Sequence, residues 1–189
     1  MGTKPQIDID SAFGKRERLA LHQLKLLEWI ATTGRKRLAI DEIQEEAQPG
    51  AVPDKWQLTK GIQHYGWQER CIRKWLEDQG RGTVKVVTGG GKTLLALSIA
   101  EAVQHTLEPG LRVAILVPTI VLMHQWYDAI LAHGNLPREV IGRVGGGYEE
   151  DFEDGRRVLI AVLASAMRQL PRLVKKANVG KRLLLIADE

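Results

Sequence analysis

Cysteine is nearly absent from this sequence, which has Cys71 alone among its 189 residues. One thiol cannot form a disulfide within the chain, so a disulfide-stabilised scaffold is excluded and a reducing compartment is favoured. No apolar run approaches the roughly 18 residues that a membrane span needs. Residues 1–11 are polar and include Asp8 and Asp10, so they do not form a signal peptide. We therefore expect a cytoplasmic location and no membrane partner.

Internal repeats and low-complexity tracts are also absent, and the five histidines lie too far apart to show metal-site spacing. Hydrophobic residues make up 44% of the chain, which suits one globular domain with a small appendage. The net charge of +4 is a mild basic bias. Such a bias is compatible with a polyanionic partner but does not require one.

The pattern of apolar residues in the sequence changes near residue 56. Before it, residues 16–32 and 39–47 carry the apolar spacing of helices, and a segment rich in proline and glycine follows at 48–53. We expect residues 1–56 to be a helical accessory segment with a linker, and residues 57–189 to be the main domain.

The main domain alternates apolar runs with helical patterns, and this alternation is typical of a parallel sheet covered on both faces. It predicts an α/β fold with a mainly parallel sheet flanked by helices. Helices are expected at 93–105 and 121–133. Strands are expected at 84–88, 112–117, 140–144, 158–163 and 183–187.

A glycine-rich segment connects the strand expected at 84–88 to the helix expected at 93–105. Glycines let backbone N–H groups approach phosphates, and the N-terminus of the next helix adds partial positive charge. A lysine here reaches the β- and γ-phosphates of ATP, and the next hydroxyl holds Mg²⁺. The phosphate loop predicted in this way consists of Thr88, Gly89, Gly90, Gly91, Lys92 and Thr93.

A plain glycine turn between a strand and a helix is the alternative for this segment. The Gly-Lys-Thr ending in a strand–loop–helix setting favours phosphate binding. One position departs from the general pattern, since Val86 stands where a glycine five residues before Gly91 is usual.

Two carboxylates follow the last apolar run, 183–187. Asp188 and Glu189 have the arrangement of a Walker B motif, in which the first residue holds Mg²⁺ and the second orients or deprotonates the attacking water. A strand that ends in Asp-Glu is a weak signal by itself, and the phosphate loop upstream strengthens it. Lys92, Asp188 and Glu189 are therefore the expected catalytic residues of an ATP hydrolase.

The order of these motifs resembles that of superfamily 2 helicases of the DEAD/DEAH class. The motif sequences are most similar to those of the branch that contains XPB-like helicases, UvrB-like domains and the helicase subunits of type III restriction enzymes. In that branch the loop commonly reads Thr-Gly-x-Gly-Lys-Thr, which accounts for Val86. The resemblance covers roughly residues 62–189 and implies the first RecA-like ATP-binding lobe of a nucleic-acid-dependent motor.

The resemblance also implies roles for residues outside the two nucleotide motifs. Gln68 stands where the family reads the adenine edge, although an ordinary exposed glutamine beside core aromatics is the alternative. Pro118 and Thr119 stand where a nucleic-acid phosphate is held, and Thr119 can also cap the following helix. Ser165 matches a further nucleic-acid contact, while Val162 replaces the threonine often found before it. The glycines at 145–147 form either a turn near the nucleic acid or a plain turn.

The resemblance implies a nucleic-acid partner, with DNA favoured over RNA, and a second RecA-like lobe that closes over ATP. It makes association with the nucleoid an alternative to a free cytoplasmic location. The chain ends within the second nucleotide motif, so we expect a fragment with little activity by itself. Two other functions stay open: a self-contained P-loop NTPase of another class, and a non-catalytic module that binds nucleic acid or protein.

Overall fold

A computed structural model describes residues 51–78, 80–87, 89–153 and 155–188. The helices expected at 16–32 and 39–47, and residues 48–50 of the expected linker, lie outside the described residues. The same is true of two predicted site residues, Thr88 and Glu189. In the part of the chain that is described, no helix has the length and apolar character to cross a membrane.

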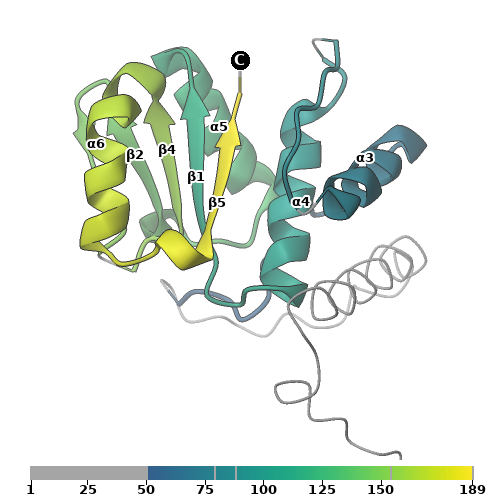
Figure 1. The fold of residues 1–189 in the computed structure, drawn as a ribbon, viewed down its shortest axis with the longest axis horizontal. Coiled ribbons are helices and arrows are strands. Elements are labelled where there is room, and N and C mark those ends of the chain that lie inside the picture. The colour runs from purple at the N-terminus through teal and green to yellow at the C-terminus, as the bar shows by residue number, and fades with distance from the viewer. Residues whose placement is uncertain (1–50, 79, 88, 154, 189) are drawn as a thin grey trace, which may run out of the picture.

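One sheet contains β1 (Arg112–Val117), β2 (Ile141–Gly145), β3 (Tyr148–Glu149), β4 (Val158–Val162) and β5 (Leu183–Ala187). The strands lie in the order β3-β2-β4-β1-β5 (Figure 1). All neighbours are parallel except the short strand β3, which pairs with β2 in the antiparallel sense. The predicted α/β class with a mainly parallel sheet is therefore confirmed.

Helices cover both faces of the sheet. Helices α4 (Lys92–Thr106), α5 (Ile120–His133) and α6 (Leu163–Lys176) pack against it, and α3 (Gly66–Glu77) packs on α4. Side chains alternate along β1: Val113 and Ile115 face the core formed with α4 and α5, while Ala114 faces the smaller core beneath α6. In Figure 1, α6 lies in front of the sheet and α5 lies behind it.

The strand expected at 84–88 does not form, and this prediction is wrong: the described residues 81–87 belong to no strand. A strand needs a neighbouring backbone to satisfy its N–H and C=O groups. The segment is instead separated from β5, the edge strand, by a cleft of about 470 Å³ that both line. Its side chains still alternate, with Val84 and Val86 half-buried and Lys85 and Val87 exposed.

Polar side chains of α4 hold the chain that precedes α3. The carboxylate of Glu101 accepts hydrogen bonds from the backbone N–H groups of Leu58 at 2.8 Å and Thr59 at 3.2 Å, and from the Thr59 hydroxyl at 3.1 Å. Gln104 accepts from the N–H of Trp56 at 3.0 Å. These bonds fasten residues 56–59 to α4, the helix that follows the glycine loop.

Candidate functional site

The loop before α4 has a backbone that requires glycine at three consecutive positions. Gly89 and Gly91 have positive φ angles of 78° and 84°, a region that other residues rarely adopt. At Gly90 an added Cβ would lie 2.5 Å from the Val86 side chain and 3.0 Å from the carbonyl oxygen of Val87. The loop therefore has the bare backbone that phosphate binding needs, directly before the N-terminus of a helix.

Lys92 is the first residue of α4, and its ammonium group folds back over this loop. It donates to the carbonyl oxygen of Val86 at 3.0 Å and lies 3.5 Å from that of Val87. The side chain is half-buried and lines the cleft between residues 82–86 and β5. A cation held here by neutral carbonyl groups can exchange them for phosphate oxygens, which are stronger acceptors.

Gln68, on α3, lies against the phosphate loop and is almost fully buried, with 1% of its surface exposed. Its amide nitrogen donates to the carbonyl oxygen of Gly91 at 3.1 Å, and its amide oxygen accepts from the N–H of Tyr65 at 2.8 Å. The ordinary surface glutamine that the sequence left open is thereby excluded. Its expected role in reading adenine stays a prediction, and the contact with Gly91 adds a role in positioning the loop.

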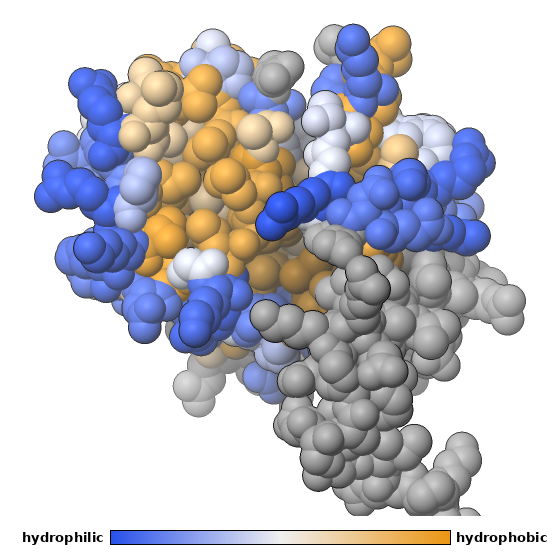
Figure 2. Space-filling view, in the orientation of Figure 1, coloured by the Kyte–Doolittle hydropathy of each residue, from blue (hydrophilic) through white to orange (hydrophobic). Residues whose placement is uncertain are grey.

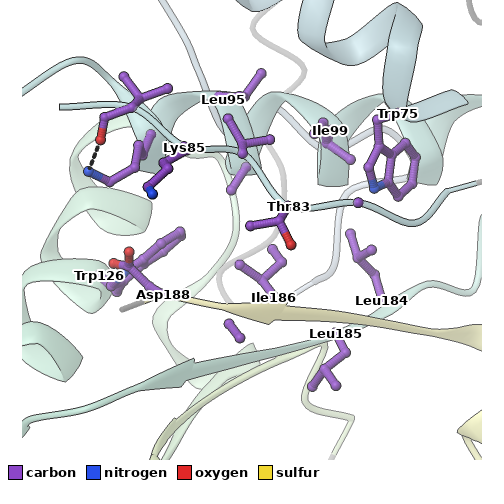
Figure 3. A pocket seen from close by; sticks show the side chains of 16 residues that line it. Trp75, Thr83, Lys85, Leu95, Ile99, Trp126, Leu184, Leu185, Ile186 and Asp188 are labelled. Carbon is purple, nitrogen blue, oxygen red and sulfur yellow. Dashed lines mark hydrogen bonds between the residues drawn. The ribbon is translucent and has the colours of Figure 1, made fainter. Parts of the chain in front are cut away.

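Asp188 follows β5 and reaches the same region from the opposite side of the cleft (Figure 3). Its backbone N–H donates to the carbonyl oxygen of Leu116 at 2.9 Å, which continues the pairing of β5 with β1. Its carboxylate oxygen Oδ2 accepts from the indole nitrogen Nε1 of Trp126 at 2.8 Å. Trp126 comes from α5, so three separate elements fix the position of this carboxylate.

Thr93 and Asp188 line a second cleft, of about 270 Å³, while Lys92 and Asp188 line the larger one. A hydroxyl and a lysine next to the glycine loop therefore each share a cleft with the Asp188 carboxylate. Hard oxygen donors of this kind suit Mg²⁺, which is usually bound by one or two protein groups together with phosphates. The residues present fit a magnesium–nucleotide complex, although they have too few ligands to hold the metal by themselves.

The predicted nucleic-acid residues lie at the edge of the sheet where the parallel strands end. Pro118 and Thr119 are exposed after β1, and the Thr119 hydroxyl accepts from the N–H of Leu122 at 3.2 Å, so it caps α5 as expected. Ser165 lies in the first turn of α6, where a Cβ added to Gly145 would approach its hydroxyl to 2.7 Å. The fold thus brings Thr119, Ser165 and the glycine turn after β2 to one edge.

Trp126 is the residue of this site that sequence reasoning missed. It stands 62 positions from Asp188 in the chain. Its spacing in α5 is that of an ordinary core tryptophan. Nothing in the sequence indicates which group its indole N–H meets, because that contact depends on how α5 packs against the end of β5.

The family model described as "Type III restriction enzyme, res subunit" matches residues 61–189. The chain belongs to this family. The match confirms the resemblance to the first lobe of superfamily 2 helicases and makes the chain a helicase-type ATPase lobe.

Two curated relatives and two solved structures are similar to this restriction-subunit-type lobe. An uncharacterized protein of Mycobacterium leprae (strain TN) is 30% identical over 127 residues, which are 66% of this chain and 20% of that protein. The ATP-dependent DNA helicase RecG of Aquifex aeolicus (strain VF5) is 33% identical over 121 residues, 59% of this chain and 14% of RecG. The chain thus spans a fifth or less of the length of these relatives.

The solved structures are two of the UvsW helicase from bacteriophage T4, each 16% identical to this chain. One has a TM-score of 0.51 and covers 67% of this chain and 52% of its own. The other has a TM-score of 0.52 and covers 69% of this chain and 32% of its own. At this level of identity the likeness concerns the fold, and it agrees with the mainly parallel sheet described above.

Proposed function

We propose that this lobe binds ATP with Mg²⁺ and supplies the first half of the catalytic site of a motor that acts on nucleic acid, with DNA favoured over RNA. The observation that carries the proposal is the convergence of Lys92 and Asp188 on one cleft beside a loop of three obligatory glycines. The similarity to RecG, whose name describes a DNA helicase, favours DNA.

The residues divide the work of holding the nucleotide. The backbone N–H groups of residues 89–91 and the ammonium group of Lys92 bind the phosphates, while Thr93 and Asp188 hold Mg²⁺ directly or through water. Bound Mg²⁺ neutralises charge on the phosphate oxygens during phosphoryl transfer. Thr88 and Glu189, which lie outside the described residues, complete the loop and orient the attacking water in this proposal. Gln68 reads the adenine edge.

The nucleic-acid backbone is proposed to cross the edge of the sheet at Pro118, Thr119 and Ser165. Thr119 can cap α5 with its oxygen and still donate its hydroxyl hydrogen to a phosphate. We further propose that residues 1–56 form an accessory segment of a protein whose second RecA-like lobe closes over ATP. The larger size of the curated relatives leaves room for such a lobe.

Changing Lys92→Ala tests the nucleotide site. The variant should bind Mg-ATP more weakly by on the order of 2 kcal/mol or more, because a charged donor to an anion is removed. Calorimetric titration of both proteins with Mg-ATP measures the difference. Lys175→Ala, which removes the same charge from an exposed position on α6, is the matched control and should bind as the wild type does. Equal affinity of the Lys92→Ala and wild-type proteins would refute the phosphate-loop assignment.

A further inference from the structure

The indole group of Trp126 makes a contact that the nucleotide motifs do not explain. Its Nε1 lies 2.8 Å from Oδ2 of Asp188, although the residue is 3% exposed and packs in the core between α5 and the sheet. A buried indole N–H needs an acceptor. Here the acceptor is the carboxylate proposed to hold Mg²⁺, rather than a backbone carbonyl group.

We propose that Trp126 is a positioning residue for the metal site, an inference that rests on the proposed function. Its N–H donates to Oδ2 and so fixes the rotation of the Asp188 carboxylate. No hydrogen bond between the described residues engages Oδ1, so this oxygen is left for Mg²⁺ or a water bound to it. Groups that orient a metal-binding carboxylate in this way usually affect metal affinity strongly.

The surroundings of Trp126 agree with this role. The residue lines both clefts, the larger one beside Lys92 and the smaller one beside Thr93. In Figure 3 the Trp126 and Asp188 side chains lie next to each other, at the end of the cleft opposite to Trp75. A rigid ring held by the core of α5 thus supports a residue that stands just beyond the end of a strand. Without this hydrogen bond the Asp188 side chain could adopt other rotamers.

The test is the gain in ATP affinity on adding Mg²⁺, measured by calorimetry with Mg²⁺ and with a chelator. Trp126→Phe keeps an aromatic ring in the core and removes the N–H. It should reduce the gain due to Mg²⁺ by roughly tenfold, the lower end of the range for outer-shell partners of a metal, and leave affinity without Mg²⁺ unchanged. Trp56→Phe, the same substitution in the core but outside both clefts, should keep the full gain.

Asp188→Ala separates the failure of this inference from the failure of the proposed function. If the wild-type chain gains nothing from Mg²⁺, the proposed metal site and this inference both fail. If Asp188→Ala abolishes the gain and Trp126→Phe preserves it, this inference fails and the metal site stands. An equal loss of affinity with and without Mg²⁺ in Trp126→Phe means that the ring acts through packing, which also overturns the inference.

A second measurement does not depend on the folding of Trp126→Phe. The wild-type chain has five tryptophans, each with an indole N–H that gives a signal in a nitrogen-15 NMR spectrum. Loss of a charged acceptor in Asp188→Ala should shift one of these signals markedly, and Mg-ADP should shift the same signal in the wild type. Five signals that are the same in both proteins would show that the hydrogen bond is absent and would overturn the inference.

Discussion

At the scale of single residues, the amide of Gln68 connects α3 to the phosphate loop. Both ends of the amide are engaged, one with Gly91 and one with Tyr65, and the group is buried. Because the carbonyl oxygen of Gly91 belongs to the loop, a change at Gln68 acts first on the placement of the loop. If Gln68 also contacts adenine, the change causes a further loss of affinity, and only adenine nucleotides show it.

Gln68→Ala is expected to weaken binding of both Mg-ATP and Mg-GTP by about 2- to 12-fold, since a hydrogen bond contributes about 0.5–1.5 kcal/mol. If Gln68 also reads adenine, the loss is larger for ATP and the preference for ATP over GTP narrows. Competition binding with the two nucleotides measures both effects. Gln63→Ala, at an exposed position before α3, is the control. Unchanged affinity for both nucleotides would rule out a role of Gln68 in the site.

Residue types and local order were enough to predict a glycine loop that leads into a helix. Glycine, lysine and threonine are required there by backbone geometry and phosphate chemistry, and these requirements are local in the sequence. Gly89 and Gly91 in this loop also have the positive φ angles that glycine permits. The Trp126–Asp188 bond could not be predicted, because its partners meet through the packing of a helix against a strand end. Contacts between distant residues leave no spacing pattern to read.

At the scale of elements, α4 has two functions at its two ends. Its N-terminal residue Lys92 faces the phosphate loop, and its buried residues Glu101 and Gln104 hold residues 56–59. The carboxylate of Glu101 is the acceptor for two buried backbone N–H groups, which would lose this hydrogen bond without it. Its contribution should therefore appear in the stability of the domain and not in its affinity for nucleotide.

Glu101→Leu is expected to lower the free energy of unfolding by roughly 1–3 kcal/mol for each donor left without an acceptor. Glu101→Gln should lose less, since its amide oxygen can accept the same bonds without the charge. Chemical denaturation measures both variants, with Glu69→Gln on the exposed side of α3 as control. Equal stability of Glu101→Leu and the wild type would show that residues 56–59 do not depend on the hydrogen bonds to Glu101.

The strands that were predicted correctly are those with a neighbouring strand to pair with. The run at 112–117 forms β1 between two parallel partners, and the run at 183–187 forms β5 beside β1. The run at 84–88 has a similar composition, but its described residues 84–87 form no strand, because they face β5 across a cleft and do not pair with its backbone. Composition describes the two faces of a strand, whereas the partner decides whether the ladder exists.

At the scale of the whole molecule, the sheet has an exposed edge, and part of the face that α6 covers is also exposed. The edge strand β5 pairs with β1 on one side, and on its other side the described residues place no strand. Leu185 on β5 is 54% exposed, and Figure 2 shows hydrophobic surface beside α6 over the middle of the sheet. Exposed apolar surface next to an open edge is typical of a site where further structure packs.

The site also lacks a group that phosphoryl transfer usually requires. None of the described residues that line either cleft is an arginine. An arginine that stabilises charge on the transferring phosphate is worth roughly 10³ to 10⁵ in rate. In the proposed site, binding depends on Lys92, Thr93 and Asp188, which this lobe carries, whereas rapid turnover depends on a cation from another part of the motor.

This chain is therefore expected to bind ATP but to hydrolyse it very slowly, with little stimulation by single-stranded nucleic acid. Few phosphate contacts are available at Thr119 and Ser165, so nucleic-acid binding should be weak and should decrease steeply with salt. A longer protein that carries a second RecA-like lobe should turn over much faster and should depend on nucleic acid. Phosphate release from both proteins, with and without single-stranded DNA or RNA, measures the difference. Rapid turnover by this chain without nucleic acid would mean that its site is complete, and a self-contained NTPase would then replace the two-lobe motor.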